Sequence, residues 1–283
     1  MRKTVIVVLS VTILAAILLL YFYTDIFIDT KQPEISNTTS TETPVTNING
    51  AELNGEITAP VFDVETSEPK YFGDVAGFYA SPVETGEYPG IVMIHEWWGL
   101  NDTIKDMAKM LSSQGYRVLA VDLYNGEIAA DSTRARELAT SLDQELALEN
   151  MQAAIVYLKN QGSTKLASLG WCFGGGQSMQ LAVEDEVLDA TVIYYGTLVT
   201  DQEQLSTVTW PVLGIFGAED TSIPVETVNE FDAALGTLNI VHEVYIYPGV
   251  GHAFANPSGQ NYAPDETKDA WGKTLAFLEK YLK

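Results

Sequence analysis

From about residue 60 onward, short apolar runs alternate with longer stretches in which apolar side chains recur every three or four positions. Apolar runs bounded by Gly, Pro or polar residues predict β-strands, whereas the longer recurrence predicts helices. The predicted strands are Tyr71–Ala80, Ile91–His95, Tyr116–Leu123, Leu166–Gly170, Ala190–Tyr195, Val212–Phe216 and Glu243–Tyr247. The predicted helices are Asp102–Gln114, Asp131–Lys159, Gly175–Glu184, Val225–Leu235 and Asp265–Tyr281.

The predicted strands are apolar along nearly their whole length, which is typical of a parallel sheet covered on both faces. Strands and helices also alternate along the chain, as they do when each helix connects two parallel strands. We therefore predict an α/β fold with a mostly parallel central sheet flanked by helices. The first strand, Tyr71–Ala80, is the candidate for an antiparallel strand at the edge.

The N-terminal segment, residues 1–28, has the pattern of a membrane anchor. Arg2 and Lys3 precede an uncharged run, Thr4–Thr24, which would span about 31 Å as a helix and match a hydrocarbon core of roughly 30 Å. We expect a transmembrane helix here that holds the rest of the chain on the extracytoplasmic side. The alternative is a cleaved signal peptide and a secreted protein, but the run is long and no A-x-A-like cleavage site follows it.

Residues 29–59 differ in composition from the segments on either side. They are rich in Thr, Ser, Asn and Glu and contain few large apolar side chains. Such a segment cannot bury enough apolar surface to fold, so we expect a flexible linker. Asn37 begins a formal glycosylation sequon, Asn-Thr-Thr. The folded domain is then expected over residues 60–283.

Composition excludes several classes of function. With 46% hydrophobic residues the chain can bury a large core, and its net charge of −23 argues against a nucleic-acid partner. Cys172 is the only cysteine, so no intramolecular disulfide can form. His95 and Glu96 resemble the start of a zinc-protease motif, but Gly99 stands where that motif needs its second histidine. We expect no metal ion and no organic cofactor.

The segment around Cys172 predicts a nucleophile. The strand Leu166–Gly170 runs into Gly170-Trp-Cys-Phe-Gly174, and a helix follows. This is the G-x-nucleophile-x-G turn, with cysteine where serine usually stands. The helix N-terminus after Cys172 places partial positive charge near the sulfur, which favours the thiolate. The alternative is that Cys172 is a small buried apolar residue in a glycine-rich turn.

Two later loops contain groups that would complete such a site. The loop after the predicted strand Val212–Phe216 contains Glu219 and Asp220, and the loop after the last predicted strand contains His252. Parallel strands end at one edge of a sheet, so these groups should lie near the nucleophile, in the chain order nucleophile, acid, histidine. His242, at the start of a strand, is expected at the opposite edge with a structural role.

Several segments within residues 60–283 resemble the dienelactone hydrolase family, also called carboxymethylenebutenolidases. They are IVMIHEWWGLN (Ile91–Asn101), VDLY (Val121–Tyr124), GWCFGG (Gly170–Gly175), YYG (Tyr194–Gly196), GAED (Gly217–Asp220) and GHAF (Gly251–Phe254). The resemblance implies an α/β-hydrolase fold and cleavage of an ester or lactone bond in a small molecule through an acyl-enzyme. It also selects Asp220 over Glu219, which gives a triad of Cys172, Asp220 and His252.

The same resemblance implies roles for residues near the triad. Glu96 would be a carboxylate that contacts the resting thiol and holds or releases its proton. The backbone N–H groups of Trp97 and Phe173 would form the oxyanion hole.

The sequence departs from the family where substrate is expected to bind. Family members that act on dienelactone hold its carboxylate with arginines, and one of these positions is Asn256 here. Arg134 or Arg136 would supply another, although their acidic neighbours equally favour a surface ion pair. Trp98 and Phe254 suggest an aromatic-walled pocket for a more apolar substrate, with core packing as the alternative.

Three other functions stay open from the sequence. A thioesterase or general carboxylesterase would need only a different pocket. A catalytically silent binding domain at the cell surface would not need Asp220 and His252 beside Cys172. A redox sensor built on Cys172 would work without His252. Nothing in the sequence indicates an oligomeric state.

Overall fold

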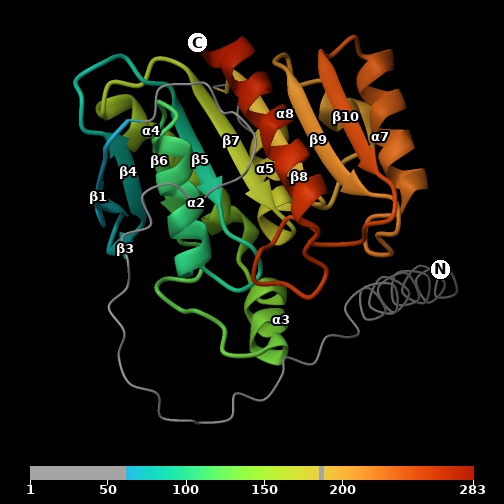
Figure 1. Cartoon of the computed structure of the whole chain (residues 1–283), viewed down its shortest axis with the longest axis horizontal. Coiled ribbons are helices and arrows are strands. Elements are labelled where there is room, and N and C mark those ends of the chain that lie inside the picture. Colours follow the sequence, from blue (N-terminus) through green and yellow to red (C-terminus); the bar gives the residue numbers. More distant parts are fainter. Residues whose placement is uncertain (1–61, 185–187) are drawn as a thin grey trace, which may run out of the picture. The chain divides into compact units, whose positions relative to one another are not determined.

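The computed structural model describes residues 62–184 and 188–283 (Figure 1). The expected anchor (1–28) and linker (29–59) therefore lie outside the described residues. Within the residues that are described, no helix is both long and apolar enough to span a membrane.

An eight-stranded sheet forms the centre of the described fold, in the order β1-β4-β6-β5-β7-β8-β9-β10. The run from β6 to β10 is parallel, whereas β1 and β4 are antiparallel to their neighbours. This confirms a mostly parallel sheet, and β4 is antiparallel as expected for Tyr71–Ala80, but the outermost strand is β1. The strands are β1 (Val64–Ser67), β4 (Phe78–Pro82), β5 (Gly90–Ile94), β6 (Arg117–Val121), β7 (Leu166–Trp171), β8 (Ala190–Tyr194), β9 (Val212–Gly217) and β10 (His242–Tyr247).

Helices cover both faces of the sheet (Figure 1). Along β5, Ile91 and Met93 join the cluster under α2 and α8, while Val92 and Ile94 join the cluster under α4, α5 and α7. This alternation follows from the two-residue period of a strand, and it explains why strands buried on both faces are apolar throughout. The helices are α2 (Asp102–Ser112), α3 (Ser132–Thr140), α4 (Gln144–Asn160), α5 (Phe173–Glu184), α6 (Gln202–Leu205), α7 (Val225–Thr237) and α8 (Pro264–Leu282).

Two predicted elements are wrong as single units. The helix expected over Asp131–Lys159 is two helices, α3 and α4, because the Asp143 side chain accepts hydrogen bonds from the first backbone N–H groups of α4 and starts a new helix. The strand expected over Tyr71–Ala80 contains a separate hairpin of β2 (Lys70–Phe72) and β3 (Val75–Ala76), followed by β4. Gly73 turns that hairpin at a φ of 55°.

The parallel strands point to one edge of the sheet, and α3 lies beside that edge (Figure 1). The loops after β5, β6, β7, β9 and β10 therefore gather there. These loops contain the candidate residues from Glu96 to His252, so the topology brings together residues that are far apart in the sequence.

Candidate active site

Cys172 forms the turn between β7 and α5 and has a φ of 54°. Its backbone N–H donates to the carbonyl of Tyr194 at 3.0 Å, and its own carbonyl accepts from the N–H of Gly176 at 3.1 Å. These two bonds hold a backbone conformation that non-glycine residues rarely adopt. The strand thus ends and the helix begins within one residue, and the partly exposed thiol stands at the carboxyl edge of the sheet.

The glycines of this turn are required by close backbone approach. A Cβ on Gly170 would lie 2.1 Å from the carbonyl oxygen of Gly174, and one on Gly174 would lie 2.3 Å from the carbonyl oxygen of Ile94. Both contacts are with backbone, which cannot move aside as a flexible side chain can. A larger residue at either position would push β7, α5 and β5 apart.

His252 connects Cys172 to a buried carboxylate. Its Nε2 lies 3.1 Å from the sulfur of Cys172, and its Nδ1 lies 2.8 Å from Oδ2 of Asp220. The other oxygen of Asp220 accepts from the backbone N–H groups of Ser222 at 2.7 Å and Ile223 at 3.0 Å. The acid is therefore held in one orientation, and it can hold the imidazole with Nε2 facing the sulfur.

The charges of this group favour a protonated imidazole. Burial lowers the pKa of His252, but the charge of Cys172 and the hydrogen bonds to Asp220 and Cys172 outweigh it and hold the pKa well above its ordinary value. The side chain of Asp220 is fully buried, whereas its neighbour Glu219 is exposed. Of the two acids in this loop, Asp220 is the one that reaches the histidine.

Glu96 is a second buried carboxylate, and only one of its two oxygens has a hydrogen-bond partner among the described residues. Its Oε2 accepts from Nδ2 of Asn256, whereas its Oε1 has no hydrogen-bond partner within the described part of the chain. Burial raises the pKa of Glu96 to about 7, although the charge of His252 and the bond from Asn256 act in the opposite direction. This side chain can therefore hold or release a proton near neutral pH.

Asn256 is itself fixed by a residue that the sequence did not predict. Its Oδ1 accepts from the backbone N–H of Ser258 at 2.9 Å and from the hydroxyl of Ser258 at 2.7 Å. These donors orient the carboxamide so that its N–H₂ group faces Glu96. The Asn-Pro-Ser sequence was the available signal, because an asparagine side chain in such a turn often accepts from the backbone two residues on.

His95 fixes the loop that carries Glu96. Its Nδ1 donates to the carbonyl of Glu96 at 2.6 Å, and its Nε2 accepts from the N–H of Leu123 at 3.2 Å. Burial lowers the pKa of His95, consistent with the neutral ring that these two bonds require. The ring also packs on Tyr124 and Phe173, with centroid distances of 4.8 and 5.9 Å. His95 thereby joins the loops after β5 and β6 to the start of α5.

The two predicted oxyanion donors lie next to site residues in the chain. Phe173 is the first residue of α5, so its backbone N–H has no acceptor within the helix. Trp97 follows Glu96 in the loop after β5, and its ring packs edge-on against Trp98 at 5.0 Å. Both residues are partly buried.

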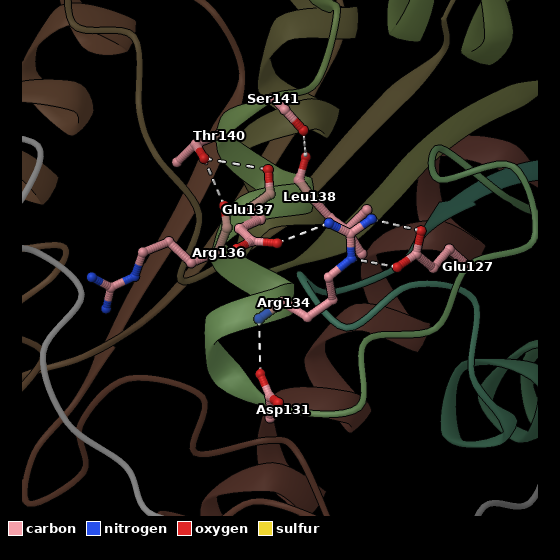
Figure 2. Close-up of polar contacts among 8 residues, drawn as sticks. All are labelled: Glu127, Asp131, Arg134, Arg136, Glu137, Leu138, Thr140 and Ser141. Carbon is pink, nitrogen blue, oxygen red and sulfur yellow. Dashed lines mark hydrogen bonds and ion pairs between the residues drawn. The ribbon is translucent and has the colours of Figure 1, made fainter.

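Arg134 forms an ion-pair cluster on α3 (Figure 2). Its Nε and Nη2 donate to the two oxygens of Glu127 at 2.5 and 2.8 Å, and its Nη1 donates to Glu137 at 2.8 Å. All three nitrogens of the guanidinium are thus engaged by carboxylates. Figure 2 shows Arg136 pointing away from this cluster. Of the two alternatives that the sequence left open for Arg134, a substrate contact or a surface ion pair, Arg134 forms the surface ion pair.

Phe254 packs in the core. It is completely buried, with its ring against Tyr195 and Tyr247 at 5.6 and 5.3 Å. Tyr195, which the sequence did not single out as a site residue, also packs edge-on against His252 at 5.3 Å. The core-packing alternative thus describes Phe254, and the ring of Tyr195 contacts the imidazole of His252.

His242 lies at the start of β10, at the opposite edge of the sheet. Its Nδ1 bonds the carbonyl of Ile240 at 2.7 Å, and its Nε2 lies 3.3 Å from Asp232. Across the described ranges, no group of three or more His, Cys, Asp or Glu side chains is placed to hold a metal ion.

Comparison with known proteins identifies relatives along most of the chain. The model of the dienelactone hydrolase family matches residues 75–282. A protein of Saccharolobus solfataricus named "Putative carboxymethylenebutenolidase" is 30% identical over 250 residues, which cover 74% of this chain and 95% of that protein. A protein of Yersinia pestis with the same name is 30% identical over 235 residues, covering 77% and 88%.

Solved structures show the same fold. A crystal structure described as a putative dienelactone hydrolase from Klebsiella pneumoniae has a TM-score of 0.70 and 26% identity, covering 77% of this chain and 99% of that one. A dienelactone hydrolase-like promiscuous phosphotriesterase from metagenomic libraries has a TM-score of 0.71 over 79% of this chain and 100% of its own. Its identity of 22% shows a shared fold alone.

Proposed function

The chain belongs to the dienelactone hydrolase family, and from this premise we propose that it cleaves an ester or lactone bond of a small molecule with Cys172 as the nucleophile. The observation that carries the proposal is the continuous contact from Asp220 through His252 to the sulfur of Cys172. A cysteine that merely filled space would not need an oriented imidazole beside it.

The reaction proceeds in two steps. The thiolate of Cys172 attacks the carbonyl carbon, and His252 gives its proton to the departing alkoxide, which leaves a thioester on the enzyme. His252 then takes a proton from water, the hydroxide attacks the thioester, and the acid is released as the thiolate re-forms. Asp220 keeps the imidazole in the orientation that both proton transfers need.

The oxyanion of each tetrahedral intermediate is held by the backbone N–H groups of Phe173 and Trp97. The first belongs to the free N-terminus of α5, where the helix dipole also favours negative charge. Each such donor lowers the barrier by about 3 kcal/mol. Their role depends on the backbone of the turn, so the glycines around Cys172 serve this step as well.

Glu96 accepts and releases the proton of the resting Cys172 thiol. Asn256 holds one carboxylate oxygen, and the other has no partner among the described residues, so it can take the proton of the resting thiol and pass it to His252, which later gives it to the alkoxide. The raised pKa of Glu96, about 7, suits a group that takes and returns a proton near neutral pH. A thioesterase or general carboxylesterase would use the same groups and differ only in its acyl pocket.

The uncharged run Thr4–Thr24 supports a location for this activity. We propose that the hydrolase domain is held at a membrane on its extracytoplasmic side, and that it is secreted if this segment is cleaved.

The test is hydrolysis by the full chain of a panel of short 4-nitrophenyl esters and small lactones. We expect activity on esters that falls by about a thousandfold or more in Cys172→Ala and in His252→Ala. Reaction of Cys172 with iodoacetamide should be faster than that of a model thiol. A wild-type chain that cleaves no ester would overturn the proposal, and full activity in His252→Ala would favour the redox-sensor alternative.

A further inference from the structure

Apart from His252, whose charge is paired with Cys172 and Asp220, the charged side chains of the loops around Cys172 are all acidic. The loops at residues 95–101, 122–131, 195–201, 218–224 and 248–263 follow β5, β6, β8, β9 and β10 at the carboxyl edge of the sheet. They contain no lysine or arginine, and their acidic residues are Glu96, Asp122, Glu127, Asp131, Asp201, Glu219 and Asp220. An anion that approaches this edge meets the combined field of these carboxylates.

The side chains of Asn256 and Glu96 do not compensate for that field. Asn256 is uncharged, and its carboxamide is held between Glu96 and Ser258. Glu96 is 6% exposed, and its Oε1 has no partner within the described part of the chain. A substrate carboxylate placed here would face this buried oxygen, and the one nearby positive charge, on His252, is already shared by Cys172, Asp220 and Glu96.

Arg134 is the cation nearest in sequence to these loops, and its charge is already neutralised. It binds Glu127 through two hydrogen bonds and Glu137 through a third, so the cluster carries one more negative charge than positive (Figure 2). Guanidinium groups bind carboxylates best through the same pair of parallel bonds that Glu127 occupies. A substrate carboxylate would therefore have to displace Glu127.

Glu127 also lies against the loop that contains Glu96. Its carbonyl oxygen would be 2.4 Å from a Cβ on Gly99, and the N–H of Ala129 donates to the carbonyl of Trp98 at 2.9 Å. The backbone of residues 127–129, just before α3, thus packs on Trp98 and Gly99 in the loop after Glu96. Because Glu127 belongs to this segment, we expect the net charge of the cluster to act on a substrate bound at the site.

From these contacts we infer that the site accepts uncharged esters and discriminates against esters whose acyl part carries a carboxylate, with Glu127 and Glu137 setting this selectivity by neutralising Arg134. The inference rests on the proposed hydrolase function and adds the charge class of its substrate.

A matched pair of substrates tests the selectivity. The 4-nitrophenyl half-ester of pimelic acid and the methyl ester of that compound differ in one methyl group and one negative charge. The full chain should cleave the neutral ester with a kcat/KM at least about tenfold higher at low ionic strength, and the ratio should shrink in about 0.5 M NaCl because salt screens the loop charges. Equal or faster cleavage of the anionic ester would contradict the inference.

A double variant tests the role of the two glutamates. Both are solvent-exposed, so Glu127→Gln with Glu137→Gln should fold normally and leave Arg134 with an uncompensated charge. Its kcat/KM for the anionic ester should rise by about three- to tenfold, while that for the neutral ester should change by less than about twofold. Glu243→Gln is the matched control, because Glu243 pairs with Lys280 near the start of β10, at the opposite edge.

The outcomes separate the inference from the proposed function. If neither ester is cleaved, the hydrolase proposal fails and the inference fails with it. If both are cleaved equally, only the inference fails. If the double variant and Glu243→Gln change the anionic-to-neutral ratio by the same factor, the selectivity comes from net charge alone and the role given to Glu127 and Glu137 is wrong.

Discussion

Two buried carboxylates, Asp220 and Glu96, act on His252, and they differ in how many of their oxygens accept hydrogen bonds. Oδ1 of Asp220 accepts hydrogen bonds from two backbone N–H groups, and Oδ2 accepts one from His252, so both carboxylate oxygens have donors. Glu96 has one bond, from Asn256, and an oxygen without a partner in the described residues. A fold that keeps such an oxygen buried does so at a cost in stability, which is a common feature of reactive sites.

That cost predicts that Glu96→Gln stabilises the fold at high pH. Burial raises the pKa of Glu96 from its ordinary 4.5 to about 7, so the folded state keeps a proton that the unfolded state loses between these values. The stabilisation from this proton is complete below pH 4.5 and is lost as the pH rises through 7. Glutamine does not ionise, so its advantage in free energy of unfolding should grow by about 3 kcal/mol between about pH 4 and 8.

Urea unfolding of the wild type and of Glu96→Gln at several pH values across this range measures the difference in their free energies of unfolding. A difference that does not change with pH would show that the raised pKa of Glu96 is absent in solution. The same variant should lose most of its esterase activity, which separates a stabilising effect from a functional one.

Asn256→Ala should shift the pH dependence of catalysis. The hydrogen bond from Asn256 stabilises the ionised form of Glu96, so its loss raises the pKa of Glu96 further above its ordinary value. In the proposed mechanism the ionised carboxylate takes the proton of the thiol, so the acidic limb of kcat/KM should move upward by about half a unit to one unit. Ser258→Ala keeps the Asn256 side chain that donates to Glu96, so it should move the acidic limb less. Identical pH profiles in wild type and Asn256→Ala would contradict the positioning role.

The sequence predicts part of this arrangement and leaves the rest to the fold. Cys172 and His252 follow from a local turn motif and from the rule that parallel strands end at one edge. The hydrogen bond between Asn256 and Glu96 joins residues 160 positions apart, and no local sequence pattern predicts it. The ion pair of Arg134 depends on which way its side chain points, which the sequence leaves open. The catalytic roles themselves stay predictions.

The separation of α3 from α4 has a consequence for the site. A continuous helix over Asp131–Lys159 would place Arg134 in the first turn of one long helix. Instead, α3 is a short helix capped by Asp131, and a turn at residues 141–143 separates it from α4. The turn lets α3 stand beside the carboxyl edge while α4 packs on the sheet (Figure 1). Capping side chains, which hydrophobic spacing does not reveal, decide where such a break falls.

Asp143→Ala should therefore destabilise the start of α4 without affecting the chemistry. The Asp143 side chain accepts from the N–H groups of Glu145 and Leu146, and losing such a cap costs about 1 kcal/mol of unfolding free energy. Asp143→Asn keeps an acceptor oxygen and is the matched control. Denaturant unfolding measures the cost, and kcat/KM on a neutral ester should change by less than about twofold. A large loss of activity in both variants would indicate that α4 and the site are coupled.

Burial explains which strands the sequence revealed. Strands β5 to β9 are buried along most or all of their length and appear in the sequence as apolar runs. Strand β1 was not predicted, because as an edge strand most of its residues are exposed and its sequence, Val-Glu-Thr-Ser, is mainly polar. The hairpin of β2 and β3 was merged into β4 because Tyr71, Phe72 and Val75 extend the apolar run across Gly73.

Taken as one chain, the protein combines an acidic domain with an N-terminal apolar run. The net charge of the whole chain, −23, works against binding to anionic lipid headgroups through its surface. Attachment to a membrane would then depend on residues 1–28 alone. The Thr- and Ser-rich residues 29–59 would serve as the spacer that keeps the acidic surface away from the bilayer.

Deleting residues 1–28 should release the protein from membranes. The run Thr4–Thr24 is long enough, at about 31 Å as a helix, to cross the hydrocarbon core. The full chain expressed in a bacterium should sediment with membranes and resist extraction by alkaline carbonate, while the deleted form should be soluble and should keep its esterase activity. Protease added to spheroplasts should degrade the domain of the full chain, because we expect Arg2 and Lys3 to keep the N-terminus in the cytoplasm. A shortened, freely soluble product from the full chain would show cleavage and overturn the anchor.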